Sequence, residues 1–316
     1  MKKEISLEAL KKKREALNHE YLSRYLQENP TQARCPHCGR LHCYPHGQTK
    51  AGTPRFYCPN CNKAFVYNVH SVFYKTHKNY DQWQRFLECY LRGESLDVCA
   101  REAQIHRNTA FRWRHKVNDA LNVLMNQDQL EGTVYLDETF VERIEKGKAQ
   151  REGLKKKRGI SKQKVNICCA IDTQGRTVIQ ASDAGRIKAS SLIHVFQGKI
   201  KEGCDLVTDS QRSYHRLVKE LQVKWHKIPS GKKKVETYTL EKVNLLHSNL
   251  KQYLQRFRGV SYAFLQGYII MFKVNEFYRK SRMLGLSERL MVKLMSLKTV
   301  LTCKQIDRQQ VSWLVS

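Results

Sequence analysis

The sequence is poor in acidic residues, with 29 Asp and Glu against 57 Lys and Arg, which gives a formal net charge of +28. A compact chain with this charge repels itself unless a polyanion neutralises part of it, so we expect nucleic acid as a partner. The basic residues run from Lys2 to Arg308 and are not confined to one tail. A hydrophobic content of 41% is enough for buried cores, which excludes wholesale disorder.

Long hydrophobic runs are also missing. The longest strongly apolar stretch, residues 262–272, is interrupted by Gln266 and Gly267 and is shorter than the about 18 residues that span a bilayer. The N-terminus begins Met-Lys-Lys-Glu and lacks the apolar segment of a secretory signal. We therefore expect no transmembrane helix, no membrane partner and a cytoplasmic, reducing environment.

Several catalytic motifs are missing as well. No glycine-rich phosphate-binding motif indicates the use of ATP, and no serine or cysteine nucleophile with a neighbouring base emerges. The eleven cysteines are odd in number, which argues against a complete disulfide framework. Their spacing is better examined for metal binding.

Four cysteines form two C-x-x-C pairs, Cys35 with Cys38 and Cys58 with Cys61, separated by nineteen residues. This spacing is typical of a zinc ribbon, in which four thiolates close a tetrahedral and structural Zn²⁺ site. Zinc would supply folding free energy of order 10 kcal/mol to a segment, residues 31–75, that is too small to rely on a core alone. Alternatives for one of the four ligands are Cys43, His37, His42 and His46.

Residues 1–30 and 78–128 have helical patterns. The first segment reads as a basic amphipathic helix, to which we assign no chemistry. The second contains two short amphipathic stretches joined by a tight link, a pattern typical of a helix-turn-helix, whose second helix enters the major groove of DNA. An ordinary helical hairpin with charged faces has the same pattern. The candidate DNA contacts are Arg107, Asn108, Arg112 and Arg114.

From residue 131 the pattern changes to short apolar strands alternating with helices, which indicates an α/β domain with one mixed sheet over residues 131–283. The expected strands are 133–140, 164–171, 177–181, 205–209 and 223–228, and the expected helices are 190–200, 213–221 and 240–256. The chain is therefore predicted to be multidomain, with a zinc ribbon and a helical domain ahead of this mixed-sheet domain.

Two aspartates of this domain stand on predicted strands, where both side chains reach a shared cleft. Asp137 follows apolar strand positions and Asp209 ends a strand of the same character. Their carboxylates would repel one another unless a divalent cation neutralises them, and hard oxygen ligands suit Mg²⁺. Two such ions would support phosphoryl transfer. Asp172 and Asp183 also follow strands, but both occur in turn sequences where Asp is favoured for backbone reasons.

The whole arrangement resembles the DDE transposases of bacterial insertion sequences that carry an N-terminal zinc ribbon and a helix-turn-helix. The resemblance covers residues 31–283. It rests on the two C-x-x-C pairs and on the motifs Tyr-Leu-Asp-Glu-Thr at 135–139, Val-Thr-Asp at 207–209, Val-Asn-Leu-Leu-His-Ser-Asn-Leu-Lys at 243–251 and Phe-Arg-Gly-Val-Ser at 257–261. The resemblance implies a ribonuclease H-like catalytic domain that acts on double-stranded DNA in the nucleoid of a bacterium. It also implies a homo-oligomer, because two DNA ends must be held together.

Carried over by position, the resemblance makes Asp137 and Asp209 the first two magnesium ligands. The position of the family's third carboxylate is Asn244, as in the Asp-Asp-Asn variants of the group, and Lys251 would hold the terminal DNA phosphate. Asn244 offers a carbonyl oxygen but no charge. His247 and Glu241 lie one helical turn from it, so either remains an alternative third ligand.

Two basic segments separate the predicted catalytic strands. The insertion 142–164 contains Lys155, Lys156, Lys157 and Arg158, and a second cluster occupies residues 224–234. Beside a metal cleft such segments would clamp duplex DNA. The tail, residues 284–316, has a helical pattern that suits either an assembly contact or packing on the domain.

The sequence therefore predicts a transposase that binds terminal inverted repeats and, with Mg²⁺, cleaves DNA ends and joins them to target DNA. The alternatives are a decayed copy that acts as a non-catalytic DNA-binding regulator and a structure-specific nuclease of the same fold.

Overall fold

A computed structural model describes residues 35–48, 54–66, 71–74, 76–125, 129–144, 161, 163–281, 285–297 and 301–308. The chain divides into two compact units. The first comprises residues 1–120 and 277–300, and the second comprises residues 121–276 and 301–316. The predicted basic helix, residues 1–30, and the cluster Lys155–Arg158 lie outside the described residues.

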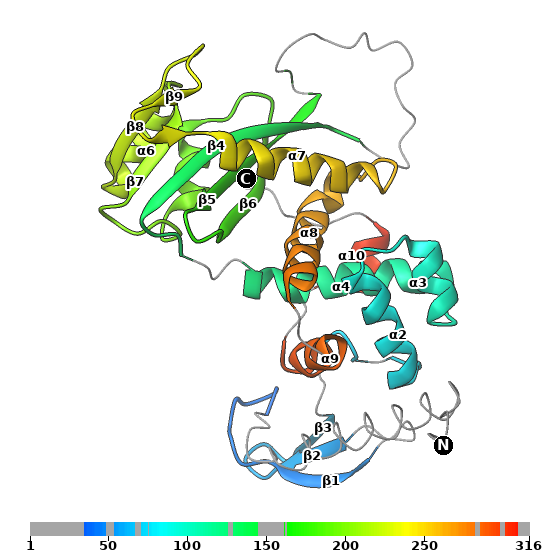
Figure 1. Ribbon diagram of the computed structural model, residues 1–316. Helices are drawn as coiled ribbons and strands as arrows, with labels where there is room; N and C mark the ends of the chain where they lie inside the picture. The colour runs from blue at the N-terminus through cyan, green and yellow to red at the C-terminus, as the bar shows by residue number, and fades with distance from the viewer. Residues whose placement is uncertain are drawn as a thin grey trace, which may run out of the picture. The chain divides into compact units, whose positions relative to one another are not determined.

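The N-terminal part of the first unit is a small antiparallel sheet in the order β1-β2-β3 (Figure 1). Its strands are β1 (Tyr44–Gln48), β2 (Pro54–Cys58) and β3 (Lys63–Val66). Phe56 and Phe65 stack with their ring centroids 6.0 Å apart and, with buried cysteines, form the core of this sheet. So small a core is marginal by itself, so a metal bound here would have a structural role.

The helical part of the first unit begins with α2 (Tyr80–Leu91), α3 (Leu96–Glu102) and the start of α4 (Arg107–Met125), and it also contains α9 (Leu286–Ser296). Two helices begin at side-chain caps. The Asn79 side chain accepts a hydrogen bond from the Gln82 N–H, and Ser95 caps α3 in the same way through Val98. The core is aromatic, with the indole rings of Trp83 and Trp113 stacked 3.5 Å apart.

The predicted tail takes part in this helical core. The α9 helix packs against α2, and the Gln84 side chain donates a hydrogen bond of 2.7 Å to Glu288 Oε1. The sequence suited the tail either to an assembly contact or to packing on the domain. The described part of α9 packs within its own unit.

The second unit is built on a five-stranded mixed sheet in the order β6-β5-β4-β7-β8. Its strands are β4 (Thr133–Glu142), β5 (Lys164–Asp172), β6 (Thr177–Ala184), β7 (Asp205–Asp209) and β8 (Lys224–Ile228). The first three pair antiparallel, whereas β7 and β8 run parallel to β4. The chain thus forms the single mixed sheet that the alternation of strands and helices predicts for this domain.

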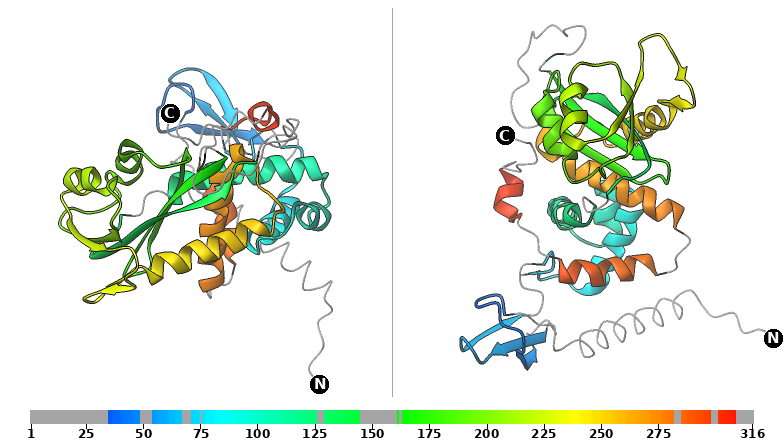
Figure 2. Two further views of the ribbon diagram at one scale, coloured as in Figure 1. Left: turned by 90° about the horizontal axis from the view of Figure 1, so that it is seen from above. Right: turned by 90° about the vertical axis from the view of Figure 1, so that its left-hand side faces the viewer.

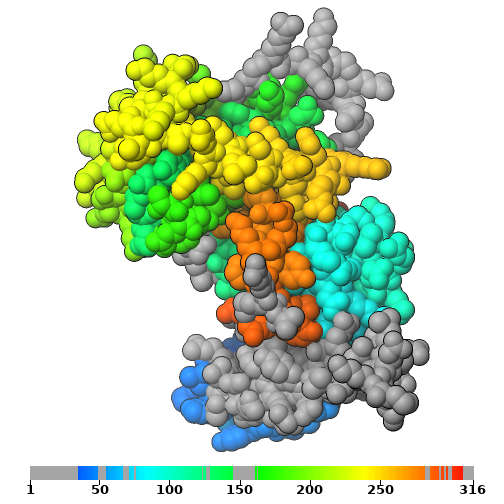
Figure 3. All heavy atoms as spheres, in the orientation of Figure 1, coloured from blue at the N-terminus to red at the C-terminus, as the bar shows by residue number. Residues whose placement is uncertain are grey.

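Helices cover both faces of this sheet (Figures 1 and 2). On one face, α5 (Ala189–Phe196) and α6 (Tyr214–Leu221) pack on the apolar side chains of Leu136, Cys168 and Leu206. On the other face, α7 (Glu241–Gln255) crosses β4 and β5, and its atoms cover the middle of the sheet (Figure 3). Because both faces are covered, β5 is buried along almost its whole length.

The remaining elements are short or complete the units. A hairpin, β9 (Lys234–Val235) and β10 (Tyr238–Thr239), precedes α7, and the 3-10 turn η2 (Tyr262–Phe264) leads into α8 (Leu265–Lys280). The last element described is α10 (Cys303–Asp307). Within the described residues, no helix combines the length and the hydropathy needed to cross a membrane.

Candidate active site and metal centres

Asp137 and Asp209 lie on neighbouring parallel strands. Tyr135 of β4 pairs with Val207 of β7, and continuing this register by two residues places Asp209 opposite Asp137. Paired residues on adjacent strands point to the same face of a sheet. The structure therefore brings the two predicted carboxylates together, on the face that α7 crosses.

The surroundings of Asp137 disfavour the ionised form of its carboxyl group. Burial raises the pKa of its carboxyl to about 6, and the negative charge of Asp209 acts in the same direction. The neighbouring backbone N–H of Glu138 and the positive charge of Lys251 oppose this increase. A cation placed between the two carboxylates would relieve their repulsion and favour their ionised forms.

Glu138 is a third carboxylate at this site, to which the sequence gave no role. Side chains alternate along a strand, so Glu138 points to the face opposite Asp137, under α6, where it is 8% exposed. Tyr214 donates a hydrogen bond of 2.8 Å to its Oε1. Burial raises its pKa to about 7. The detectable signal was a charged residue at an inward-facing position of a predicted strand.

The α7 helix carries the other predicted catalytic side chains. Asn244 and Lys251 are exposed on it, two turns apart, and Glu241 is exposed at its first residue. His247 is 8% exposed, and no hydrogen-bond partner of its Nε2 is found among the described residues. Burial lowers its pKa to about 4, so the imidazole is neutral at physiological pH. A neutral imidazole nitrogen is a competent metal ligand.

These residues fit a hard divalent cation. Two carboxylates share one face of the sheet, and Asn244 adds a neutral carbonyl oxygen on the helix that covers this face. Carboxylate and carbonyl oxygens are the ligands that Mg²⁺ prefers. Among the described residues, the only group of three or more Cys, His, Asp or Glu side chains close enough to share one ion is elsewhere, in the small sheet.

A cavity of about 320 Å³ opens beside Lys251. Its walls are the end of β4, the C-terminal half of α7 and the segment that leads into α8. They include the apolar side chains of Phe140, Leu254 and Tyr262. Of the predicted catalytic side chains, only Lys251 lines this cavity, and most of the other lining residues are apolar.

The second candidate metal centre is the four-cysteine cluster of the small sheet. The Sγ atoms of Cys35, Cys38, Cys58 and Cys61 all lie within 4.8 Å of one another. Burial acts to raise the pKa of Cys58, but backbone N–H groups of Cys61 and Asn60 bring it down to about 6, which favours a thiolate. Cys43 is buried nearby but does not belong to the group. The cluster has the composition of a structural zinc site.

The predicted DNA contacts on α4 have different surroundings. Asn108 and Arg107 are exposed at the start of the helix, where the Arg107 Nε donates to Asp97 Oδ1 at 2.7 Å. Arg112 is half-buried. Arg114 is fully buried, with one guanidinium nitrogen 2.7 Å from the Glu94 carbonyl oxygen. The expectation that Arg114 contacts DNA was wrong, because its side chain fastens the helices of its own unit.

The second predicted basic cluster, residues 224–234, is described by the structure. Lys224, Lys227, Lys232, Lys233 and Lys234 are exposed along β8 and the start of the β9–β10 hairpin. Lys227 Nζ lies 4.0 Å from the centroid of the Trp225 ring. Exposed ammonium groups in this number suit a phosphate backbone.

Comparison with known proteins gives a match for the second unit. Residues 129–275 match the model of the ISXO2-like transposase domain. No curated protein sequence matches the chain.

Solved structures that match parts of this chain include a simian T-cell lymphotropic virus intasome in complex with the PP2A regulatory subunit B56 gamma, at 11% identity and a TM-score of 0.31. The match covers 56% of this chain and 54% of that chain, so this chain spans about half the length of that relative. A pre-cleavage Mos1 transpososome is similar at 12% identity and a TM-score of 0.25, over 61% of this chain and 76% of that one. The Mos1 transposase paired-end complex with the left transposon end has 12% identity and a TM-score of 0.26, over 65% and 80%.

The family match covers Asp137, Asp209, Asn244, His247 and Lys251 together. The family that the sequence motifs indicated is therefore confirmed. The second unit of the chain carries a match to the ISXO2-like transposase domain over residues 129–275, in agreement with the resemblance that the sequence motifs indicate.

Proposed function

We propose that this chain binds the terminal inverted repeats of its own element, cuts the DNA at the element ends and joins the new 3′ hydroxyls to target DNA. The observation that carries this proposal is the placement of Asp137 and Asp209 on one face of neighbouring strands, inside the matched transposase domain. Lys251 is close enough to act electrostatically on Asp137.

In the proposed reaction, Asp137 and Asp209 would hold divalent cations, and Asn244 would supply a third oxygen ligand, with His247 or Glu241 as its alternative. Bound Mg²⁺ would activate the attacking oxygen and stabilise the charge of the leaving one. Lys251 would bind the phosphate next to the cut and fix its position relative to the carboxylates. Asn244 brings no negative charge, so the ionisation of both aspartates matters more than in an all-acidic site.

The two steps use the same arrangement of residues. In the first, a water oxygen attacks the phosphorus, the bond from phosphorus to the element's 3′ oxygen breaks, and that oxygen takes up a proton. In the second, this 3′ hydroxyl loses its proton as it attacks a target phosphorus, and the target's 3′ oxygen leaves. Neither step needs ATP, because one phosphodiester replaces another in the joining step.

DNA recognition is assigned to the first unit and to basic segments of the second. Arg107, Asn108 and Arg112 would contact DNA from α4, used as the second helix of a helix-turn-helix. The four-cysteine cluster would hold Zn²⁺ and keep the small sheet folded. Lys155, Lys156, Lys157 and Arg158 would bind phosphates near the cut. Two copies of the chain would hold the two ends of the element.

The test uses the purified full chain, Mg²⁺ and labelled duplexes from the DNA that flanks its gene. Wild type is expected to cut an end and join it to a second duplex, whereas Asp137→Asn and Asp209→Asn are expected to do neither. The matched control is Asp205→Asn, four residues before Asp209 on the same strand, where the carboxylate pairs with His226 at 2.8 Å.

The outcomes separate the three functions considered. Cutting without joining would indicate a structure-specific nuclease. Binding of the duplexes by wild type without cutting or joining, in Mg²⁺ or Mn²⁺, would contradict catalysis and indicate a DNA-binding regulator.

A further inference from the structure

Both carboxylate oxygens of Asp209 are held by one residue, Gln211, in the loop that follows β7. The Gln211 backbone N–H donates to Asp209 Oδ1, and its side-chain Nε2 donates to Asp209 Oδ2, each at 3.0 Å. Gln211 is itself exposed, so its side chain is free to rotate unless something anchors it.

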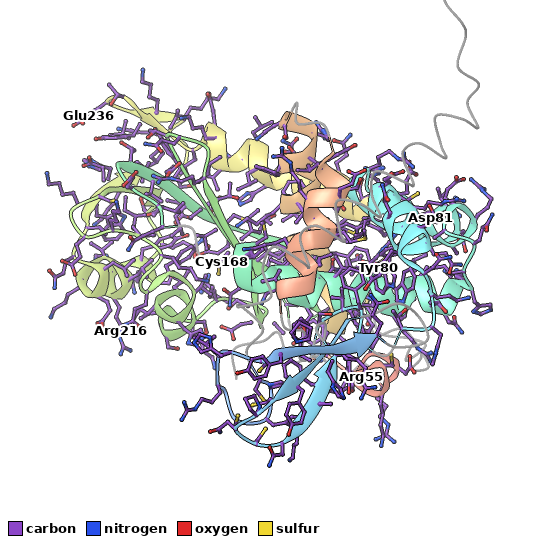
Figure 4. The ribbon with its side chains drawn as sticks, turned by 90° about the horizontal axis from the view of Figure 1, so that it is seen from below. Arg55, Tyr80, Asp81, Cys168, Arg216 and Glu236 are labelled. Atoms are coloured by element: carbon purple, nitrogen blue, oxygen red, sulfur yellow. The ribbon has the colours of Figure 1, made fainter. Side chains whose placement is uncertain are left out.

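The anchor is Glu138. The same Nε2 of Gln211 lies 3.5 Å from Glu138 Oε2, so one amide group faces two carboxylates. Glu138 is fixed in turn by Tyr214 on α6, and its β5 neighbour in the sheet is Cys168, which is labelled in Figure 4 and completely buried. Gln211, which contacts Asp209, is therefore connected through Glu138 to the buried interior of the domain.

The carboxylates of Asp209 and Glu138 also determine the orientation of the Gln211 side-chain amide. A carboxylate oxygen accepts hydrogen bonds, so Nε2 faces both of them and the amide oxygen points away. A rotation of the amide by half a turn would bring its oxygen against Asp209 and Glu138, where it would be repelled. Without the charge of Glu138, this preference rests on Asp209 alone.

We infer that Glu138 is a positioning residue that acts through Gln211 to orient the Asp209 carboxylate for divalent cations. The inference rests on the proposed function, in which Asp209 is a metal ligand. Hydrogen-bond partners of metal-binding carboxylates orient them and commonly change metal affinity 10- to 100-fold when removed, as an order of magnitude. Glu138 itself points away from the cleft and is not assigned as a ligand.

The experiment measures cation binding directly, by calorimetry with Mg²⁺ and with Mn²⁺ on the full chain. The variants are Glu138→Gln, Gln211→Leu and the double variant, with Asp209→Asn as the reference for a lost ligand. Gln197→Leu is the matched control, because Gln197 is also exposed and follows a helix of the same unit. Thermal midpoints of the metal-free proteins report on folding.

We expect each single variant to weaken cation binding about tenfold. Because Glu138 acts through Gln211, the double variant should bind no more weakly than Gln211→Leu alone. Glu138→Gln keeps an acceptor for Tyr214, so the midpoints of all variants should stay within a few degrees of wild type.

Three results would overturn the inference. The first is wild-type affinity in Gln211→Leu. The second is a double variant whose loss equals the product of the single losses, since Glu138 would then act by its own charge. The third is a loss of cation affinity that occurs only in variants with a lowered thermal midpoint, because the loss would then result from impaired folding. If the chain binds Mg²⁺ through Asp209 but never cuts DNA, the proposed function is contradicted. The binding curves would still show whether Glu138 positions Asp209.

Discussion

Neighbouring residues of one strand have opposite surroundings at the centre of this protein. Asp137 lies on the face crossed by α7, next to Asp209 and Lys251, whereas Glu138 lies on the face covered by α6. Burial raises the pKa of both carboxyls above their usual values. Both groups therefore keep their protons to a higher pH than an ordinary carboxyl does.

The raised pKa of Asp137 predicts a pH-dependent effect of Mg²⁺. A carboxyl with a pKa near 6 in the folded chain and 3.8 ordinarily adds stability at low pH that is lost as the pH rises through about 6. Mg²⁺ binds the ionised form, so it competes with the proton below pH 6. We expect a fixed excess of Mg²⁺ to raise the thermal midpoint clearly at pH 8 and far less at pH 5.

Differential scanning calorimetry at the two pH values checks this expectation. In Asp137→Asn the group that titrates is gone, so the midpoint should respond to Mg²⁺ weakly and equally at both. A larger response of wild type at pH 5 than at pH 8 would contradict the assignment of Asp137 as a ligand.

The burial of Arg114 predicts a structural role for this side chain. Arg114→Ala removes a hydrogen bond to the Glu94 carbonyl and leaves a cavity, which should lower the free energy of unfolding by about 2–4 kcal/mol. Arg101→Ala is the control, because the Arg101 side chain is 73% exposed, and should cost less than about 0.5 kcal/mol. Urea unfolding measures both. Equal costs would show that the guanidinium is not needed for packing.

Among the elements, the small sheet has a small described core, and most of the buried residues in that core are cysteines. Its apolar contacts are little more than Phe56, Phe65 and the cysteines themselves. Four Sγ atoms within 4.8 Å of one another would otherwise be a costly group of thiols. A tetrahedral metal bound there would turn that group into the main stabilising feature of the sheet.

The four-cysteine cluster predicts one zinc ion per chain. Cys35→Ser or Cys61→Ser should abolish stoichiometric zinc, measured by atomic emission, and should unfold the sheet, measured by loss of amide protection. Cys43→Ser tests the neighbouring thiol that lies outside the group and should retain the metal. Zinc lost in Cys43→Ser and kept in Cys35→Ser would show that the ligand set is different.

Strand positions were predicted better than side-chain roles. The five strands of the large sheet and the helices α5, α6 and α7 follow the expected ranges within a few residues, because apolar alternation and turn sequences are local signals, whereas α8 was not predicted. The β9–β10 hairpin was missed, since its basic sequence reads as a loop. Glu138 was missed for another reason, as its partner Tyr214 is distant in sequence. Arg114 was misjudged because a charged residue on an amphipathic helix is normally exposed.

At the scale of the whole molecule, the positive charge dominates. It predicts DNA binding that weakens steeply with salt, by a slope of about 0.9 for each phosphate contacted. The variant Lys156→Ala/Lys157→Ala should reduce that slope by about 2. Arg216→Ala/Lys219→Ala is the control, because these exposed residues lie on α6, on the face of the sheet opposite α7. Arg216 is labelled in Figure 4.

Fluorescence anisotropy of a labelled duplex at several salt concentrations measures both slopes. Equal slopes for the two double variants would mean that the insertion makes no special contribution. A lower affinity with an unchanged slope would indicate an indirect effect on folding.

The parallel pairing of β4 with β7 has a consequence for protein synthesis. Asp137 leaves the ribosome early, but its partner strand follows only after β5, β6 and α5, and α7 with Lys251 comes later still. Domains fold as units while the chain is being made, and pairing between distant strands is slow. A truncated product that ends before α7 would therefore contain Asp137 without a complete cutting site. If the chain cuts DNA as proposed, premature termination of translation would yield an inert fragment and not an unregulated nuclease.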